Sequence, residues 1–125
     1  MKYLLIKNDV PLTHISSGKL QRKNNFIHDR RTLDTFVIVV CIDGILHITQ
    51  ENRSYSLKKN QYLILFKETE HFGHLASPGP LSYYWCHFKI PNDDYTVIQG
   101  GKIQFPEYSG ENHSLNRGGG GGVLC

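Results

Sequence analysis

The chain has 125 residues, 39% of them hydrophobic, and a formal net charge of +3. This is the length of one domain with a single core, and no apolar run approaches the ~18 residues of a membrane-spanning helix, so no membrane span is predicted. The charge is concentrated in residues 1–31, where seven Lys and Arg stand against Asp9 and Asp29, a balance of +5 (7 − 2). Because these basic residues are dispersed and lack aromatic stacking partners, a solvated arm is favoured over a nucleic-acid surface.

Both the first residues and the cysteines are typical of a cytoplasmic protein. The apolar start, residues 1–6, meets polar residues before the apolar core of a signal peptide is complete. The three cysteines, Cys41, Cys86 and Cys125, are odd in number and fit no zinc-binding or redox spacing. Cys41 and Cys86 lie within apolar runs, where cysteine behaves as a small hydrophobic residue. We therefore expect a reducing, cytoplasmic location.

Residues 1–25 are predicted to form an N-terminal arm. Within it, residues 4–6 have the composition of a strand, Pro11 interrupts that strand, and residues 15–18 are typical of a turn. Residues 24–28 are predicted as a short strand through which the chain enters the main body of the domain.

A β-branched run at residues 36–42 opens a series of short strands separated by turn signals. It ends at Asp43-Gly44, which is a two-residue hairpin signal, and residues 45–49 are predicted to be the returning strand. The later strand-like segments are residues 55–57, 62–66, 71–75, 81–90, 95–98 and 103–105. Strands at roughly 8–12-residue spacing without a helical period predict an all-β barrel or sandwich.

The barrel is assigned to residues 26–106. Residues 107–125 are predicted to form a flexible tail, because they are polar and then glycine-rich and can bury too little surface to become ordered. The glycine-rich end is typical of a cloning-derived or frame-shifted terminus rather than of evolved structure.

Seven histidines raise the question of a metal site. Such a site in a β-barrel needs three or four ligands from adjacent strands, with two commonly at i and i+2 of one strand. The sequence has no His-x-His, and His71 and His74 differ in parity, so a straight strand would point them to opposite faces. Exposed or hydrogen-bonded histidines are therefore favoured, and no metal or other cofactor is predicted. A metal-dependent enzyme using His47, His71 or His74 is the alternative.

No arrangement typical of nucleophilic catalysis is present. No serine stands in a strand–turn–helix elbow, and Cys86 and His87 are neighbours on a strand, so they face opposite sides. The paired carboxylates of Asp93 and Asp94 lie in a loop. We therefore expect that the chain is not an enzyme.

The strand predicted from Leu81 onward has a distinctive aromatic face. Alternation places Tyr83, Trp85 and His87 on the same side. Such a face combines apolar ring surface with a hydroxyl, an indole N–H and an imidazole, which suits a small polar ligand such as a sugar. The residues alone leave two interpretations open: these rings line a ligand pocket, or they only fill a small barrel.

Several segments, taken in order, resemble the sensor domain of AraC-type transcription regulators. The opening of that domain resembles residues 26–38 followed by Asp43-Gly44 and residues 45–48, and its middle resembles residues 55–66. His71 falls at a characteristic turn, and Leu81-Ser82-Tyr83-Tyr84-Trp85-Cys86-His87-Phe88 resembles the Tyr-Tyr-Trp-x-His-Phe segment of Gram-positive members. The resemblance spans residues 26–90. The chain departs from the family pattern at residues 60–61 and 67–70.

The resemblance implies a cupin-type double-stranded β-helix, a jelly-roll barrel that binds an effector, often a sugar. It implies that the full-length protein is a homodimer that binds promoter DNA through a helix-turn-helix domain; that domain and the dimerisation helices are expected to be missing from this chain. It also implies pocket positions, and with the aromatic face these give the candidate ligand-binding residues His28, Arg30, Arg31, His71, Tyr83, Trp85 and His87. The alternatives are a metal-dependent cupin enzyme of the isomerase or dioxygenase type, or a ligand-free barrel used for dimerisation.

Overall fold

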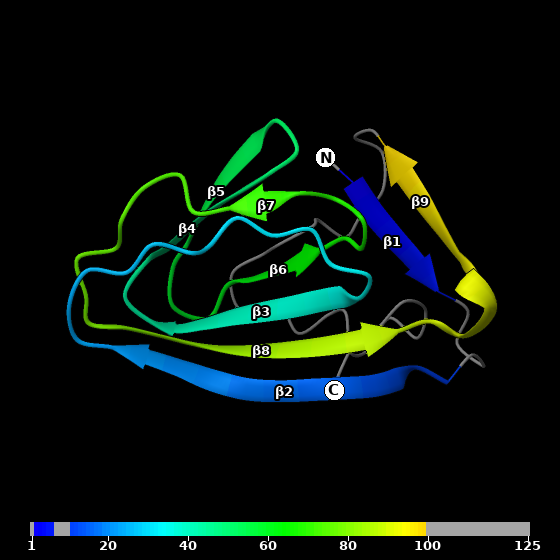
Figure 1. Cartoon of the computed structure of the whole chain (residues 1–125), viewed down its shortest axis with the longest axis horizontal. Coiled ribbons are helices and arrows are strands. Elements are labelled where there is room, and N and C mark those ends of the chain that lie inside the picture. The colour runs from blue at the N-terminus through cyan, green and yellow to red at the C-terminus, as the bar shows by residue number, and fades with distance from the viewer. Residues whose placement is uncertain (1, 7–10, 100–125) are drawn as a thin grey trace.

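The computed structural model describes residues 2–6 and 11–99, whose regular secondary structure is almost entirely β-strand (Figure 1). The strands are β1 (Lys2–Ile6), β2 (Thr13–Arg22), β3 (Phe36–Asp43), β4 (Leu46–Gln50), β5 (Arg53–Leu57), β6 (Tyr62–Leu65), β7 (His71–Phe72), β8 (Leu81–Lys89) and β9 (Tyr95–Gln99). One short 3₁₀ turn, Pro91–Asp93, precedes β9. Within the described ranges, no helix is both long and apolar enough to cross a membrane. The strand predicted at residues 103–105 and the tail predicted at residues 107–125 lie outside the described residues.

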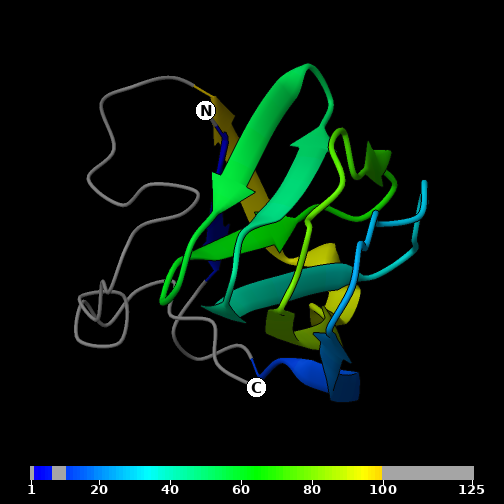
Figure 2. The same ribbon diagram turned by 90° about the vertical axis from the view of Figure 1, so that its left-hand side faces the viewer.

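The strands form two main antiparallel sheets. The first has the order β2-β8-β3-β6 and the second the order β5-β4-β7, while β1 and β9 pair with each other separately. Figures 1 and 2 show the β4–β5 hairpin lying over the four-stranded sheet, with β1 and β9 together at one end.

The connection between β2 and β3 extends the three-stranded sheet. Backbone hydrogen bonds of 2.6–3.0 Å join residues 26–33 to residues 68–77, and the pairs are Phe26 with Ser77, His28 with Gly73, Arg31 with His71, and Leu33 with Glu68. The segment of residues 26–33, light blue to cyan in Figure 1, therefore runs along β7 as an irregular fourth strand. The strand predicted at residues 24–28 is reduced here to a single bridge at Phe26.

Two four-stranded layers connected in this order make a jelly roll, which is built from two Greek keys. The all-β, cupin-type jelly-roll barrel expected from the sequence is confirmed. The segment of residues 13–22 belongs to the barrel as its strand β2, although the sequence assigned residues 1–25 to an arm.

The hairpin predicted at Asp43-Gly44 is wrong. β3 pairs with β8 and β6, whereas β4 pairs with β5 and β7, so the chain passes here from one sheet to the other. Gly44 has φ +78° and a methyl group on it would collide with the carbonyl of Pro80. An Asp-Gly pair supplies the positive φ of any tight corner, whether or not the two flanking strands pair with each other.

The turn predicted at residues 15–18 is also wrong, because these residues lie inside β2. Gly18 pairs with Trp85 of β8, and a methyl group on Gly18 would collide with the indole ring. Glycine within a strand commonly marks such a close approach rather than a turn. The sequence shows the glycine but not the ring that lies on it.

Two hydrophobic clusters stabilise the fold, one on each side of the four-stranded sheet. The cluster between the two sheets contains Val37, Val39, Cys41, Leu46, Ile48, Tyr55, Leu57, Leu63, Leu65, Leu81 and Tyr83. The cluster on the other face, which includes residues of β1, contains Leu4, Ile6, Phe36, Ile64, Phe66, Phe88 and Ile90. Alternate residues of β3 enter opposite clusters, so the period of two along this strand decides which side chains face the barrel interior.

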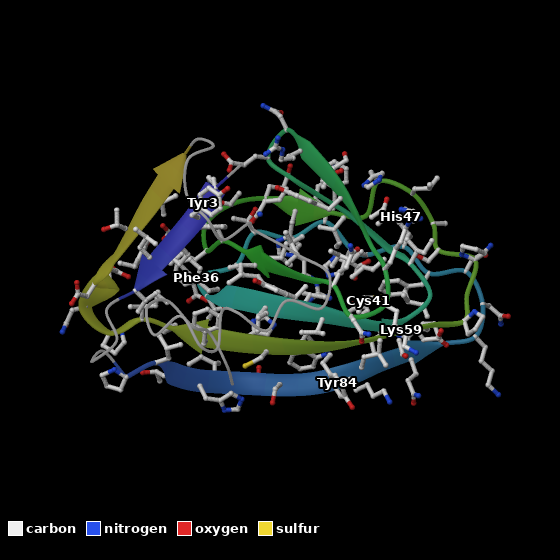
Figure 3. All side chains as sticks on the ribbon, turned by 180° about the vertical axis from the view of Figure 1, so that it is seen from behind. Tyr3, Phe36, Cys41, His47, Lys59 and Tyr84 are labelled. Atoms are coloured by element: carbon white, nitrogen blue, oxygen red, sulfur yellow. The ribbon has the colours of Figure 1, made fainter. Side chains whose placement is uncertain are left out.

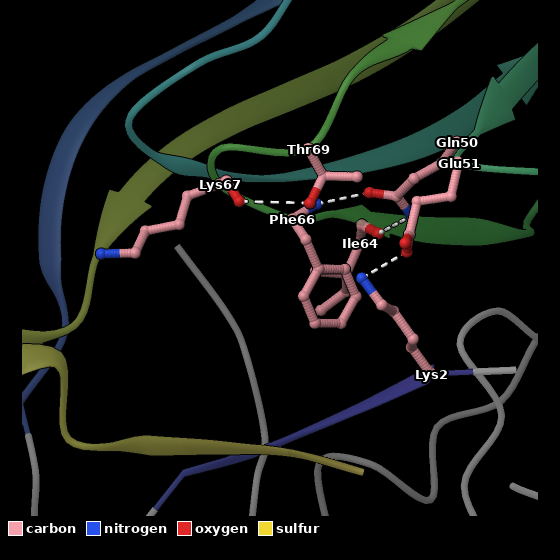
Figure 4. A network of polar contacts seen from close by, with 7 residues as sticks. All are labelled: Lys2, Gln50, Glu51, Ile64, Phe66, Lys67 and Thr69. Atoms are coloured by element: carbon pink, nitrogen blue, oxygen red, sulfur yellow. Dashed lines mark hydrogen bonds and ion pairs between the residues drawn. The ribbon is translucent and has the colours of Figure 1, made fainter. Parts of the chain in front are cut away.

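A buried glutamine connects the two sheets. The side-chain amide of Gln50, at the end of β4, accepts a hydrogen bond from the N–H of Phe66 (2.6 Å) and donates one to the carbonyl of Ile64 (3.2 Å), as drawn in Figure 4. The next residue, Glu51, forms an ion pair with Lys2 of β1. These contacts attach the end of the three-stranded sheet to β6 and to the N-terminal strand.

Candidate ligand-binding site

A cavity of about 210 Å³ lies within the barrel. Its walls come from both sheets and from the segment of residues 26–33. The lining residues are Leu20, His28, Arg31, Leu33, Val37, Val39, Leu65, His71, Tyr83, Trp85 and His87.

One wall is the aromatic face of β8. Tyr83, Trp85 and His87 all line the cavity, as the alternation along the strand predicted. Trp85 and His87 form an edge-to-face pair with ring centroids 5.4 Å apart. Because open space lies in front of these rings, they line a pocket as well as contributing to the core.

The opposite wall is built around the pairing of Arg31 with His71. Each residue donates its backbone N–H to the other's carbonyl, at 2.9 Å in both directions. Residues directly opposite in an antiparallel pair project their side chains to the same face. Both residues therefore line the cavity, although the side chain of Arg31 is 51% exposed, and the ring of His28 lies 5.2 Å from that of His71.

Hydrogen bonds orient two of the three imidazoles in the wall. Nδ1 of His28 donates to the carbonyl of Asp29 (2.7 Å), and Nδ1 of His87 is bonded to the hydroxyl of Thr35 (2.9 Å). His71 is 2% exposed, its Nδ1 is enclosed by protein atoms rather than open to the cavity, and its ring interacts with the backbone of Thr69.

Burial favours the neutral form of all three imidazoles. Burial lowers the pKa of His71 to about 4, and His28 and Arg31 act in the same direction. Burial also lowers the pKa of His28 and of His87, again with Arg31 contributing. Burial raises the pKa of Tyr83 to about 12. At neutral pH, Arg31 is therefore the charged group of the lining, among neutral hydrogen-bonding rings.

Six of the seven candidate residues line the cavity, and Arg30 does not. Its guanidinium forms an ion pair with Glu70 (2.7 Å) and lies 3.9 Å from the ring centroid of Phe72. Neighbouring residues in an extended segment face opposite sides, so only one of Arg30 and Arg31 can reach the interior.

Five apolar lining residues were not among the sequence candidates: Leu20, Leu33, Val37, Val39 and Leu65. Val37 and Val39 share a face of β3, and that alternation is visible in the sequence. The contribution of Leu20 depends on β2, whose place in the barrel was not predicted from the sequence.

A second pair of histidines lies outside the cavity. His47 and His74 have ring centroids 5.5 Å apart, and their Nδ1 atoms are bonded to Ser56 (2.8 Å) and Thr49 (2.9 Å). Figure 3 shows His47 on the three-stranded sheet, well away from Tyr84 on β8. Among the described residues, no group of three or more His, Cys, Asp or Glu side chains is arranged to hold a metal ion.

Comparison with known proteins identifies the family. The family model of the AraC-like ligand binding domain matches residues 15–118, which is most of the chain. The chain belongs to the AraC-like ligand-binding domains. It is 31% identical over 86 residues to the uncharacterized HTH-type transcriptional regulator YisR of Bacillus subtilis (strain 168), an alignment that covers 69% of this chain and 30% of YisR. This AraC-like domain thus spans about a third of its curated relative.

Solved structures give more distant matches. A solved structure from Salmonella typhimurium, assigned as ethanolamine utilization protein Q, matches with a TM-score of 0.46 and 20% identity. The match covers 62% of this chain and 67% of that one. The 7S globulin of Momordica charantia matches with a TM-score of 0.47 and 14% identity, over 70% of this chain and 28% of that one.

Proposed function

We propose that this AraC-like domain is the sensing domain of a transcription regulator and that it binds a small hydroxylated molecule of the sugar class in its barrel. The observation that carries the proposal is the cavity itself, in which Trp85 and Tyr83 offer ring surface on one side and Arg31 and His71 offer hydrogen bonds on the other. Sugars are bound by stacking and hydrogen bonding of this kind.

The size of the cavity limits the ligand. At about 210 Å³ it is smaller than the roughly 300–1,000 Å³ typical of pockets for drug-sized molecules. A monosaccharide is therefore a better candidate than a disaccharide. Ligand binding would stabilise one arrangement of the barrel walls, and a regulator uses such differential stabilisation to change the state of a second domain.

The regulatory part of the proposal is supported by the similarity to YisR, which is described as an HTH-type regulator. Promoter DNA would be bound by a helix-turn-helix domain, and the full-length protein would be a cytoplasmic homodimer. The domain itself would bind its ligand without chemical conversion.

Isothermal titration calorimetry of this domain against a panel of monosaccharides and disaccharides tests the proposal. We expect saturable binding of at least one monosaccharide, and Trp85→Ala should abolish it while circular dichroism shows an intact fold. Tyr84→Ala is the matched control, because Tyr84 is on the same strand but points to the opposite face and is 51% exposed. Absence of binding to every sugar, or conversion of a bound sugar seen by chromatography, would contradict the proposal.

A further inference from the structure

We propose that the molecule bound in the cavity is a small hydroxy carboxylic acid of the sugar-acid class, with its carboxylate on Arg31 and its hydroxyls on the neutral rings of the wall. This inference rests on the proposed function, since it names the chemical class of the ligand of that same cavity. The ligand inferred here carries a negative charge, whereas an ordinary sugar is neutral.

The charge of the cavity wall favours an acidic ligand. The lining contains Arg31, three imidazoles, a phenol and an indole, and no carboxylate. Asp29 and Asp34, whose charges act on Tyr83 and His87, are 78% and 82% exposed and are not part of the lining. A partly enclosed space with a fixed positive group and no acidic side chain has a positive potential, which favours an anion over a neutral molecule.

The Arg31 guanidinium is only weakly engaged by other side chains of the described residues. Its ion pair with Asp29 is long, at 3.5 Å, and joins a single guanidinium nitrogen to a carboxylate that is mostly in solvent. The neighbouring Arg30, by contrast, is held at 2.7 Å by Glu70 and lies on a phenylalanine ring. The planar guanidinium of arginine matches a carboxylate through two parallel hydrogen bonds. The side chain of Arg31 lines the cavity and is 51% exposed, so it can turn this fork toward a ligand there.

Hydroxyl groups on the ligand suit the rest of the wall, where three imidazoles, a phenol and an indole surround Arg31. Burial lowers the pKa of each of these imidazoles, which favours their neutral form. A hydroxyl both donates and accepts, so it can bond to a neutral imidazole in either tautomer. Since Arg31 and His71 are paired through their backbones and both line the cavity, a carboxylate on Arg31 has hydroxyl-binding rings beside it.

The experiment compares matched neutral and acidic sugars by calorimetry. D-galactose and D-galacturonate, D-glucose and D-glucuronate, and D-glucose and D-gluconate are titrated into the domain at low and at high salt. We expect at least one acid to bind about tenfold or more tightly than its neutral parent, as charge-assisted hydrogen bonds imply, and its affinity to fall as salt rises.

Two adjacent arginines provide the variant and its control. Arg31→Gln should weaken binding of the acid by about tenfold or more and binding of its neutral parent by clearly less, because only the acid loses a charge-assisted pair. Arg30→Gln removes the same charge outside the cavity and should change neither affinity. Unchanged binding of the acid by Arg31→Gln would overturn the inference.

The outcomes separate this inference from the proposed function. If neutral sugars bind as tightly as the acids or more tightly, the acid class is wrong while the sensing function stands. If neither neutral nor acidic sugars bind, the proposed function fails and this inference fails with it. Tight binding of an acid that Arg31→Gln weakens and Arg30→Gln does not would support both.

Discussion

Arg31 and His71 exchange both of their backbone hydrogen bonds, each at 2.9 Å, although they are far apart in the sequence. This bridge attaches the connection before β3 to strand β7 and places two polar side chains side by side in the cavity wall. Any change that shifts residues 26–33 against β7 would move both groups relative to the aromatic wall of β8. The polar half of the site therefore depends on the pairing of two irregular segments.

Acid should destabilise the domain through His71. The folded state holds this imidazole with a pKa of about 4, whereas the unfolded chain binds the proton near pH 6.5. Between these values the unfolded state binds more protons, so the free energy of unfolding should fall as pH drops from about 6.5 to 4, by up to about 1.4 kcal/mol per pH unit for this group. His28 and His87 add to the slope, because burial lowers the pKa of each.

The check is urea unfolding at pH 7, 6 and 5. His71→Gln, which does not titrate, should reduce the dependence of the free energy of unfolding on pH relative to the wild type. His14→Gln, at an exposed position on β2, is the control and should leave the dependence unchanged. An identical slope in His71→Gln and the wild type would contradict this account of the buried imidazole.

Gly18→Ala should disturb the aromatic wall. A methyl group at this position meets the indole of Trp85, which would have to move away from β2. We expect a loss of ligand affinity in calorimetry and a shift of the fluorescence of Trp85, which is the single tryptophan of the chain. Ser17→Ala, one residue earlier on the same strand, should show neither effect. Unaltered fluorescence and affinity in Gly18→Ala would contradict the prediction, because β2 would then accommodate the methyl group without displacing the indole.

Gln50→Leu should destabilise the fold without touching the cavity. It leaves the buried N–H of Phe66 and the carbonyl of Ile64 without their side-chain partner, and such losses cost about 1–3 kcal/mol for each unsatisfied group. Chemical denaturation measures the change, and Gln21→Leu on an exposed position of β2 is the control. Equal stability of the two variants would mean that Gln50 does not couple the sheets energetically.

Thr35→Val should weaken ligand binding by removing the hydroxyl that is bonded to Nδ1 of His87 at 2.9 Å. The side chain keeps its shape but can no longer orient the ring, so a loss of roughly 3–10-fold in affinity is expected from one hydrogen bond. Thr35→Ser retains the hydroxyl and should bind like the wild type. If both variants bind equally well, His87 does not depend on this contact.

The composition of the strands was sufficient to predict the class of fold and one wall of the site. Side chains alternate along a strand with a period of two, so the shared face of Tyr83, Trp85 and His87 could be predicted from spacing. The same local rule assigned Val37 and Val39 to one side of β3. These features depend on a few consecutive residues, and the sequence contains all the information needed for them.

The pairing of distant segments could be decided only by the tertiary structure. Nothing local distinguishes Arg31 from Arg30, and the difference arises because Arg31 is the residue opposite His71. The corner at Gly44 and the strand around Gly18 have ordinary turn residues, whose role depends on which sheet each strand joins. Strand partners are set by the collective burial of both hydrophobic clusters, and that is a property of the whole chain rather than of any one segment.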